Sequence, residues 1–226
     1  MIFANRQKAG NELGQALQKY KNEDLVVIGI PRGGVVVAAR VAKILRTSLD
    51  VIIPRKIGAP HNPEVAIGAV TQDGTLIKDE ALIKLLGITD TEIFDLAGQV
   101  EHEISRRVKI YRGGRSGVVM RNKTVIIVDD GIATGFTIKA ALQSVRKSEA
   151  NRLVLAVPVA PSETIAELNK LVDDLVCLDA PEVFYAVGQF YSDFDQTTDE
   201  EVIELLAEAN LLVSSRTASA SSRLFT

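Results

Sequence analysis

Two adjacent carboxylates, Asp129 and Asp130, stand at the end of the apolar run 125–128. That run reads Val-Ile-Ile-Val, which is typical of a strand buried on both faces of a sheet. A turn rich in Gly and Thr follows, and a helical pattern begins near Ile138. Ligands of open parallel sheets bind beyond the carboxyl ends of the strands, so chemistry is expected at this turn.

The turn from Ala133 to Thr137 suits a phosphate. Its backbone N–H groups open a helix and concentrate positive potential there, while Thr134 and Thr137 add hydroxyl donors. Two carboxylates beside such a turn would repel a bare phosphate. They suit a ligand that carries vicinal hydroxyls or a divalent metal next to its phosphate, as a ribose 5-phosphate does.

A second strand, turn and helix precede this one in the chain. The strand at residues 25–30 ends in Pro31-Arg32-Gly33-Gly34, where the two glycines permit a close approach of backbone N–H groups to a ligand and Arg32 supplies a cation. A third strand, 49–54, ends in Arg55-Lys56, which indicates a further contact to an anion. A solvated basic pair is the alternative for these two residues.

Together these segments resemble the phosphoribosyl pyrophosphate (PRPP) signature of the type I phosphoribosyltransferases. The resemblance runs from about residue 3 to residue 209 and includes the Arg-Lys-Ile-Gly-Ala-Pro and Tyr-Arg-Gly-Gly-Arg segments. It implies that Asp129 and Asp130 hold the ribose hydroxyls, directly or through Mg²⁺, and that Arg32 and Lys56 act with them in catalysis. The residues implied to bind the 5-phosphate are Ala133, Thr134, Gly135, Phe136 and Thr137, and those implied to bind the pyrophosphate are Arg32, Gly33, Gly34 and Lys56. The family also leads us to expect a non-proline cis peptide at Arg32–Gly33.

The reaction implied by the resemblance displaces pyrophosphate from C1 of PRPP by a nitrogen nucleophile, expected to be a nucleobase. Relatives that act on 6-oxopurines carry an acid where this chain has Ala133, which argues against that substrate. A non-catalytic PRPP or nucleotide sensor is the alternative. P-loop and Rossmann proteins and serine hydrolases are excluded, because Gly-x-x-x-x-Gly-Lys-Ser/Thr, Gly-x-Gly-x-x-Gly and Gly-x-Ser-x-Gly are all absent from the sequence.

Relatives close a flexible loop over the reacting centre, and two segments here are interpreted as that loop. One is 112–117, with Arg112 and Arg115, and the other is 58–64, with His61. We favour the first, for which a simple linker from helix to strand is the alternative. Phe184 and Tyr185 are expected to stack on the base, unless they belong to a peripheral packing cluster.

Composition restricts the class of protein. The 226 residues are 46% hydrophobic and 24% charged with a net charge of −3, so a large core is expected and a nucleic-acid partner is not. One cysteine, Cys177, suits a reducing cytoplasm, and no apolar run approaches the ~18 residues that a membrane span requires. A homodimer is compatible with the resemblance.

The element order predicts an α/β fold with a doubly wound, mostly parallel sheet of about five core strands and helices on both faces. One domain, 1–209, is expected to contain an insert at about 57–121, made of a hairpin and helices, and a hood over the acceptor at about 179–197. Residues 57–64 are interpreted as a loop, and 210–226 as a disordered tail.

Overall fold

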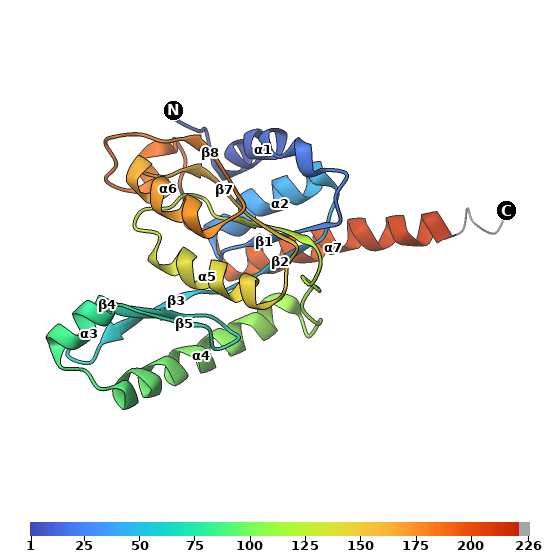
Figure 1. The fold of residues 1–226 in the computed structure, drawn as a ribbon. Helices are drawn as coiled ribbons and strands as arrows, with labels where there is room; N and C mark the ends of the chain where they lie inside the picture. Colours follow the sequence, from blue (N-terminus) through green and yellow to red (C-terminus); the bar gives the residue numbers. More distant parts are fainter. Residues whose placement is uncertain (222–226) are drawn as a thin grey trace.

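The computed structural model describes residues 1–221, with side chains to residue 211, and centres on a five-stranded, all-parallel sheet of order β2-β1-β6-β7-β8 (Figure 1). Its strands in chain order are β1 (Leu25–Gly29), β2 (Leu49–Val51), β6 (Thr124–Val128), β7 (Arg152–Val159) and β8 (Asp174–Asp179). Every residue of β1 and of β6 is buried, as their β-branched sequences predict. The predicted fold class is confirmed.

Helices cover both faces of this sheet, because alternate residues of each strand point to opposite sides. Val27 of β1 packs with the helices α1 (Arg6–Ala16), α2 (Gly33–Leu45) and α7 (Asp199–Ser221). Its neighbours Val26 and Ile28 pack on the other face with α5 (Phe136–Lys147) and α6 (Ser162–Leu168). Two layers of helix thus enclose the sheet and leave its strand ends as the places where loops gather.

A second, smaller group of elements lies below the main sheet in Figure 1. It is a three-stranded antiparallel sheet of β3 (Arg55–Ala59), β4 (Asn62–Val70) and β5 (Leu76–Lys78), backed by α3 (Glu80–Leu86) and α4 (Asp90–Arg112). We call it the insert lobe. Thr89 and Glu92 form a capping box at the start of α4. The Ser144 hydroxyl of α5 donates to Asp73 at 3.0 Å, which ties the lobe to the core.

Our interpretation of residues 57–64 as a loop is wrong. β3 extends to Ala59 and β4 begins at Asn62, so only a tight turn separates the two strands. The prediction rested on the proline and glycine content of this segment. In the structure Gly58 lies at an irregularity in the strand register, and its backbone packs against Pro63.

The C-terminal segment also differs from the prediction. α7 continues well past Asn210 to Ser221, where we expected a disordered tail from residue 210. The rest of that predicted tail, 222–226, lies outside the described residues. Within the described part of the chain, no helix has the length and apolar character needed to cross a membrane.

Residues 180–198, between β8 and α7, form an irregular segment around the short helix η3 (Val187–Phe190). We call this segment the hood, after its predicted role. It runs beside the N-terminus, where Phe3 N donates to the Phe190 carbonyl at 2.8 Å and Ser192 N donates to the Phe3 carbonyl at 2.8 Å. The N-terminus therefore pairs with the hood.

Candidate functional site

Asp129 and Asp130 leave the carboxyl end of β6 at the centre of the main sheet. The turn that follows is fastened to the next strand, because Ile132 N donates to the Val159 carbonyl at 3.0 Å. Gly135 caps α5 with φ +70°, a left-handed conformation that favours glycine. The chain thus turns sharply from strand to helix directly beside the two acids.

The predicted phosphate turn is open to solvent at Ala133 and Thr134. The Thr164 hydroxyl of α6 donates to the Ala133 carbonyl at 2.8 Å and fixes the turn from behind. Among the described residues, no partner is recorded for the backbone N–H groups of Thr134, Gly135 and Phe136. Unpaired amides at the start of a helix are an anion-binding arrangement.

The glycine turn follows β1, which is the neighbour of β6 in the sheet. α2 begins at Gly33, and the cis peptide lies at Pro31–Arg32. Our prediction of a cis bond at Arg32–Gly33 is therefore wrong by one residue. The Arg32 carbonyl already accepts Val35 N at 3.1 Å, so the Arg32–Gly33 peptide belongs to the first helical turn.

The two turns come together at one edge of the sheet. A Cβ added to Gly34 would lie 2.6 Å from Asp129 Oδ1, and one added to Gly33 would overlap Asp130 Oδ2. Only glycine lets the chain pass so close to the acids. The acid pair and the glycine turn therefore form a single site.

Asp129 is held in an environment that disfavours its charge. Although the side chain keeps some exposed surface, it is surrounded by protein atoms, and this desolvation together with the neighbouring Asp130 raises its pKa well above the ordinary value. Asp129 Oδ1 also accepts Asp130 N at 2.8 Å, and the charge of Arg6 acts in the opposite direction to lower the pKa. Burial and the neighbouring carboxylate therefore both oppose ionisation of Asp129.

Arg6, at the start of α1, is a site residue that the sequence reasoning missed. Its Nε lies 2.6 Å from Asp130 Oδ2, and its Nη1 donates to the Asp195 carbonyl at 2.7 Å. Its guanidinium stacks on the Phe194 ring at 3.8 Å, and the Tyr191 hydroxyl donates to the Asp130 carbonyl at 2.5 Å. One signal was available: a cation in the first turn of a helix opposes the helix dipole, which indicates a compensating tertiary partner.

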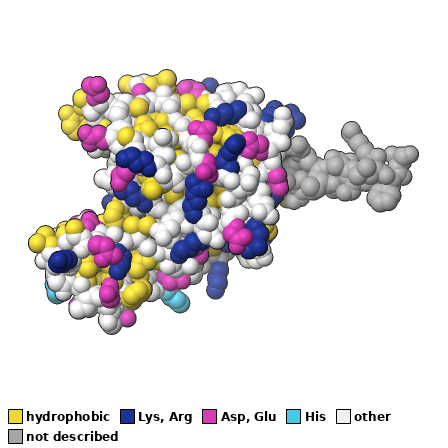
Figure 2. Space-filling model, in the orientation of Figure 1, with side chains coloured by type: hydrophobic (Ala, Val, Ile, Leu, Met, Phe, Trp, Pro, Cys, Tyr) yellow, Lys and Arg dark blue, Asp and Glu magenta, His cyan; other side chains and the backbone are white. Residues whose placement is uncertain are grey.

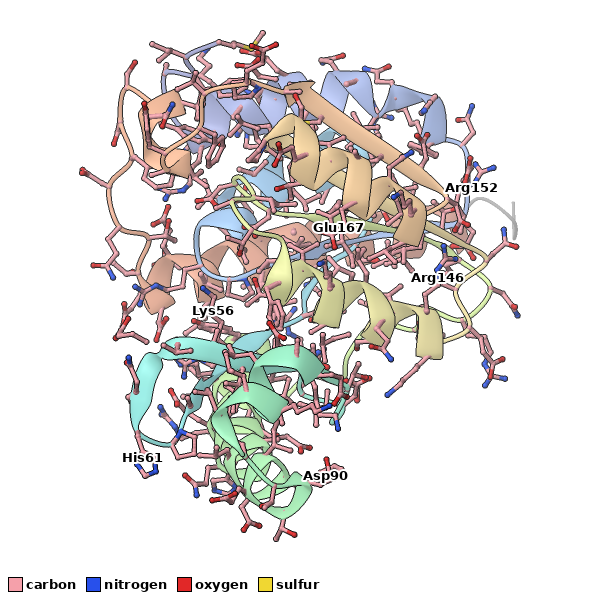
Figure 3. All side chains as sticks on the ribbon, turned by 60° about the vertical axis from the view of Figure 1, so that its left-hand side comes forward. Lys56, His61, Asp90, Arg146, Arg152 and Glu167 are labelled. Atoms are coloured by element: carbon pink, nitrogen blue, oxygen red, sulfur yellow. The ribbon has the colours of Figure 1, made fainter. Side chains whose placement is uncertain are left out.

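The two predicted pyrophosphate cations lie on different elements. Lys56 is exposed on β3, and Figure 3 places it where the insert lobe faces the core. Figure 2 shows the surface hollowed between these two bodies. Arg32 is 3.6 Å from Asp199 in the first turn of α7. Lys56 therefore belongs to the insert lobe and Arg32 to the glycine turn, while Arg55 is paired with Glu103 of α4.

The residues proposed for a mobile loop lie in two places, Arg112 and Arg115 together at the end of α4 and His61 in the insert lobe. Arg112 ends α4 and its Nε donates to the buried Asp50 at 2.9 Å, while Val118 N donates to the other oxygen of that carboxylate, also at 2.9 Å. Exposed Arg115 donates only to the Arg112 carbonyl. His61 lies at the far end of the insert lobe, away from Lys56 (Figure 3).

The predicted stacking residues differ in exposure. Phe184 packs on Phe190 with ring centroids 5.1 Å apart, in a cluster with Phe3 and Tyr191. Tyr185 is 87% exposed. The packing alternative thus describes the placement of Phe184, and the aromatic residue nearest the acid pair through its contacts is Tyr191.

Metal binding by protein side chains alone has little support. No group of three or more His, Cys, Asp or Glu side chains in the described part of the chain is arranged to hold an ion. Two carboxylates, one of them paired with Arg6, fit an ion that takes most of its ligands from water and phosphate. Mg²⁺ behaves in this way in phosphate-binding enzymes.

Fold and site together define an α/β protein in which two strand-helix turns meet beside a pair of acids at one edge of a parallel sheet. A family model described as "Phosphoribosyl transferase domain" matches residues 2–195. The chain belongs to the phosphoribosyl transferase family.

Similar proteins agree with this assignment. The chain is 40% identical over 209 residues to the Mycobacterium tuberculosis (strain H37Rv) protein named "Putative phosphoribosyl transferase Rv0571c", and the match covers 92% of this chain and 47% of that protein. It thus spans about half the length of the curated relatives it matches first. The crystal structure of the protein TT1426 from Thermus thermophilus superposes with a TM-score of 0.80 at 40% identity, covering 92% of this chain and 99% of that one.

Proposed function

We propose that this chain is a Mg²⁺-dependent phosphoribosyltransferase that uses PRPP and transfers its phosphoribosyl group to a nitrogen nucleophile, with a nucleobase as the expected acceptor. The observation that carries the proposal is the meeting of the glycine turn with the acid pair at Gly33 and Gly34. A ligand with a charged group at each end and hydroxyls between them matches this arrangement. Family membership supports the reaction class.

Each of three parts of the site binds a different group of PRPP. The amides of Thr134 to Phe136 hold the 5-phosphate, and the carboxylates of Asp129 and Asp130 accept hydrogen bonds from the ribose hydroxyls. Arg32, with the backbone of Gly33 and Gly34, holds the pyrophosphate, and Lys56 approaches it from the insert lobe. Each contact replaces water with a fixed group, which orients C1 toward the acceptor.

The charges of the site favour bond cleavage at C1. The departing pyrophosphate leaves the ribose ring with oxocarbenium character, which the nearby carboxylates stabilise. Arg32 and Lys56 stabilise the negative charge that develops on the leaving group. Mg²⁺, held mainly by PRPP oxygens and completed by Asp129 or Asp130, would supply further charge neutralisation when bound.

The hood is the proposed acceptor side. Its Tyr191 contacts Asp130 directly, its Asp195 carbonyl accepts from Arg6, and Phe184 and Tyr185 lie earlier in the same segment. Ala133 in the phosphate turn supplies no carboxylate to a 6-oxopurine, so adenine-like or pyrimidine acceptors fit better. A cytoplasmic location is part of the proposal and is supported by the single cysteine.

The test is release of pyrophosphate from PRPP and Mg²⁺ in the presence of a panel of nucleobases and small amines. The proposal expects turnover with at least one nitrogen acceptor, and none when Asp129 and Asp130 are both changed to Asn. Tight binding of PRPP by calorimetry without pyrophosphate release across the panel would favour the sensor alternative. Absence of binding would refute both.

A further inference from the structure

Arg6 occupies a position that its own helix does not favour. It opens α1, whose first turn contains no acid, so its charge adds to the positive end of the helix dipole. Its partner Asp130 comes from a distant part of the chain, and the two side chains are only 12% and 15% exposed. An ion pair this shielded is costly to desolvate and gives little net stability by itself.

We propose that Arg6 is a positioning residue for the reaction: it fixes Asp130 for the ribose hydroxyls and couples that acid to the hood. The inference rests on the function proposed above and assigns a role to a residue outside the signature segments. Three contacts of the Arg6 guanidinium support it: one with Asp130, one with the Asp195 carbonyl and one with the Phe194 ring.

The guanidinium of Arg6 is held by the hood as well as by Asp130. Nη1 donates to the Asp195 carbonyl at 2.7 Å, and the flat face rests on the Phe194 ring at 3.8 Å. A planar group fixed by an edge contact and a face contact has little freedom to rotate. The direction of Nε, and with it the position of Asp130 Oδ2, is therefore set by the hood.

Asp130 is held on both its side chain and its main chain. Arg6 engages Oδ2, while the Tyr191 hydroxyl donates to the Asp130 carbonyl at 2.5 Å. Arg6 is bonded to one of the two carboxylate oxygens, and our proposal assigns the other, Oδ1, to a ribose hydroxyl. Hood residues 191–195 thus determine, through Arg6 and Tyr191, how the sugar is gripped.

Charge balance gives the same assignment. Asp129 and Asp130 are adjacent, and the glycine turn that would carry the pyrophosphate touches both. Without a compensating cation, the two acids would repel each other and the ligand. Arg6 neutralises Asp130 beside the glycine turn, because a Cβ added to Gly33 would lie 2.6 Å from Arg6 Nε.

Arg6→Gln, Arg6→Lys and Arg40→Gln test the inference. Arg40 of α2 is the matched control, because its Nε also donates to a side-chain oxygen, that of Asn11 in α1, at 2.8 Å and away from the site. We expect Arg6→Gln to weaken PRPP binding roughly tenfold to a hundredfold, as expected for loss of a buried charged partner. Arg6→Lys keeps the charge and should recover part of the affinity, and Arg40→Gln should bind as the wild type does.

A second measurement does not depend on PRPP. Arg6→Gln and Asp130→Asn are combined in a double-mutant cycle, and the free energy of unfolding in urea is measured for each variant. Because Arg6 Nε is bonded to Asp130 Oδ2, the effects of the two changes should not be additive. Arg40→Gln combined with Asp130→Asn should give additive effects, since Arg40 is bonded to Asn11.

The outcomes separate this inference from the proposed function. Wild-type protein that neither binds PRPP nor releases pyrophosphate refutes the function, and the double-mutant cycle then decides alone whether Arg6 holds Asp130. Additive effects of Arg6→Gln and Asp130→Asn on stability, or wild-type PRPP affinity in Arg6→Gln, overturn the inference. If Arg6→Gln does not fold, Phe194→Leu replaces it and should weaken PRPP binding in the same direction, to a smaller extent.

Discussion

Gly33 and Asp130 are in direct contact, and a methyl group added to Gly33 would overlap the Asp130 carboxylate. The first residue belongs to the turn after β1 and the second to the turn after β6. These strands are parallel neighbours, with Gly29 opposite Val128, so both turns leave the same edge of the sheet. The contact joins two segments that are about a hundred residues apart in the chain into one candidate site.

Gly33→Ala should therefore impair PRPP binding. The new methyl group would overlap Asp130 Oδ2 and lie 2.6 Å from Arg6 Nε, so the acid or the turn must move. We expect a loss of about 1–3 kcal/mol in the free energy of unfolding, the scale of overpacking, together with weaker binding by calorimetry.

Gly98→Ala is the control for that change. Gly98 lies in α4, where an added Cβ would meet nothing within 4 Å, and alanine is the better helix former by up to about 1 kcal/mol. Its stability should rise slightly and its PRPP affinity should stay the same. Equal behaviour of the two variants would contradict the close contact at Gly33.

The stability of the protein should depend on pH through Asp129. Its pKa in the folded state is raised, by burial first and by Asp130 second, above the ordinary value of 3.8. The protonated carboxyl therefore stabilises the fold at pH below 3.8, and this contribution is lost as the pH rises through the higher folded value. Asp129→Asn removes the effect, so its stability relative to wild type should increase across that window in urea unfolding.

Asp173→Asn should change stability with pH in the opposite direction. Hydrogen bonding from Arg146 lowers the pKa of Asp173, so its contribution is present above the unfolded pKa and is lost as the pH falls through the folded value. That variant should be less stable than wild type near neutral pH, with the difference fading in acid. A parallel pH response of the two variants would be incompatible with the assigned environments.

The sequence was sufficient for the main sheet because its strands are runs such as 125–128, in which local preference and burial agree. It was also sufficient to place Asp130 and Gly33 on one sheet edge, since parallel topology determines where strands end. It failed at β3, where Gly58 and Pro60 suggest a loop but long-range pairing with β4 overrides local preference.

The parts of the site that the sequence did not predict depend on contacts between distant residues. Arg6 lies in an ordinary amphipathic helix, and its partner Asp130 is 124 positions away. The glycines that follow Arg112 suggested a mobile loop. Arg112 instead forms an ion pair with Asp50, a buried acid in β2, and hydrophobic periodicity does not predict that pairing. Single-residue patterns carry no information about such pairs, so Tyr191 and Asp199 were missed for the same reason.

Thr134→Val should weaken PRPP binding by about 1–3 kcal/mol, the scale of an unmet hydrogen bond to a charged group. Thr134 is exposed in the phosphate turn, so the exchange of hydroxyl for methyl should leave folding unaffected. Calorimetry measures the loss. Thr91→Val, at an exposed position of α4, is the matched exchange and should bind PRPP normally; a similar loss there would remove the support for the phosphate turn.

Lys56→Ala should slow the release of pyrophosphate, by roughly tenfold to a hundredfold, because a preorganised cation at the leaving group is lost. Arg55→Ala is the control: successive residues of a strand point to opposite faces, and Arg55 is turned toward Glu103 of α4. Steady-state rates of both variants show whether Lys56 contributes to turnover. Wild-type turnover in Lys56→Ala would assign this lysine to the solvated surface.

Arg112→Gln should destabilise the fold and thereby show whether this residue anchors the chain or moves over the site. Asp50 is 7% exposed at its side chain and accepts hydrogen bonds from Arg112 Nε, Val51 N and Val118 N. Removing the cation leaves a buried carboxylate uncompensated, which costs about 3 kcal/mol or more. Arg115→Gln, three residues farther along, changes an exposed side chain and should alter stability by less than about 0.5 kcal/mol. Thermal and urea unfolding of the two variants give the comparison. If Arg112→Gln instead keeps wild-type stability and loses turnover, Arg112 acts over the reacting centre and the anchor assignment is wrong.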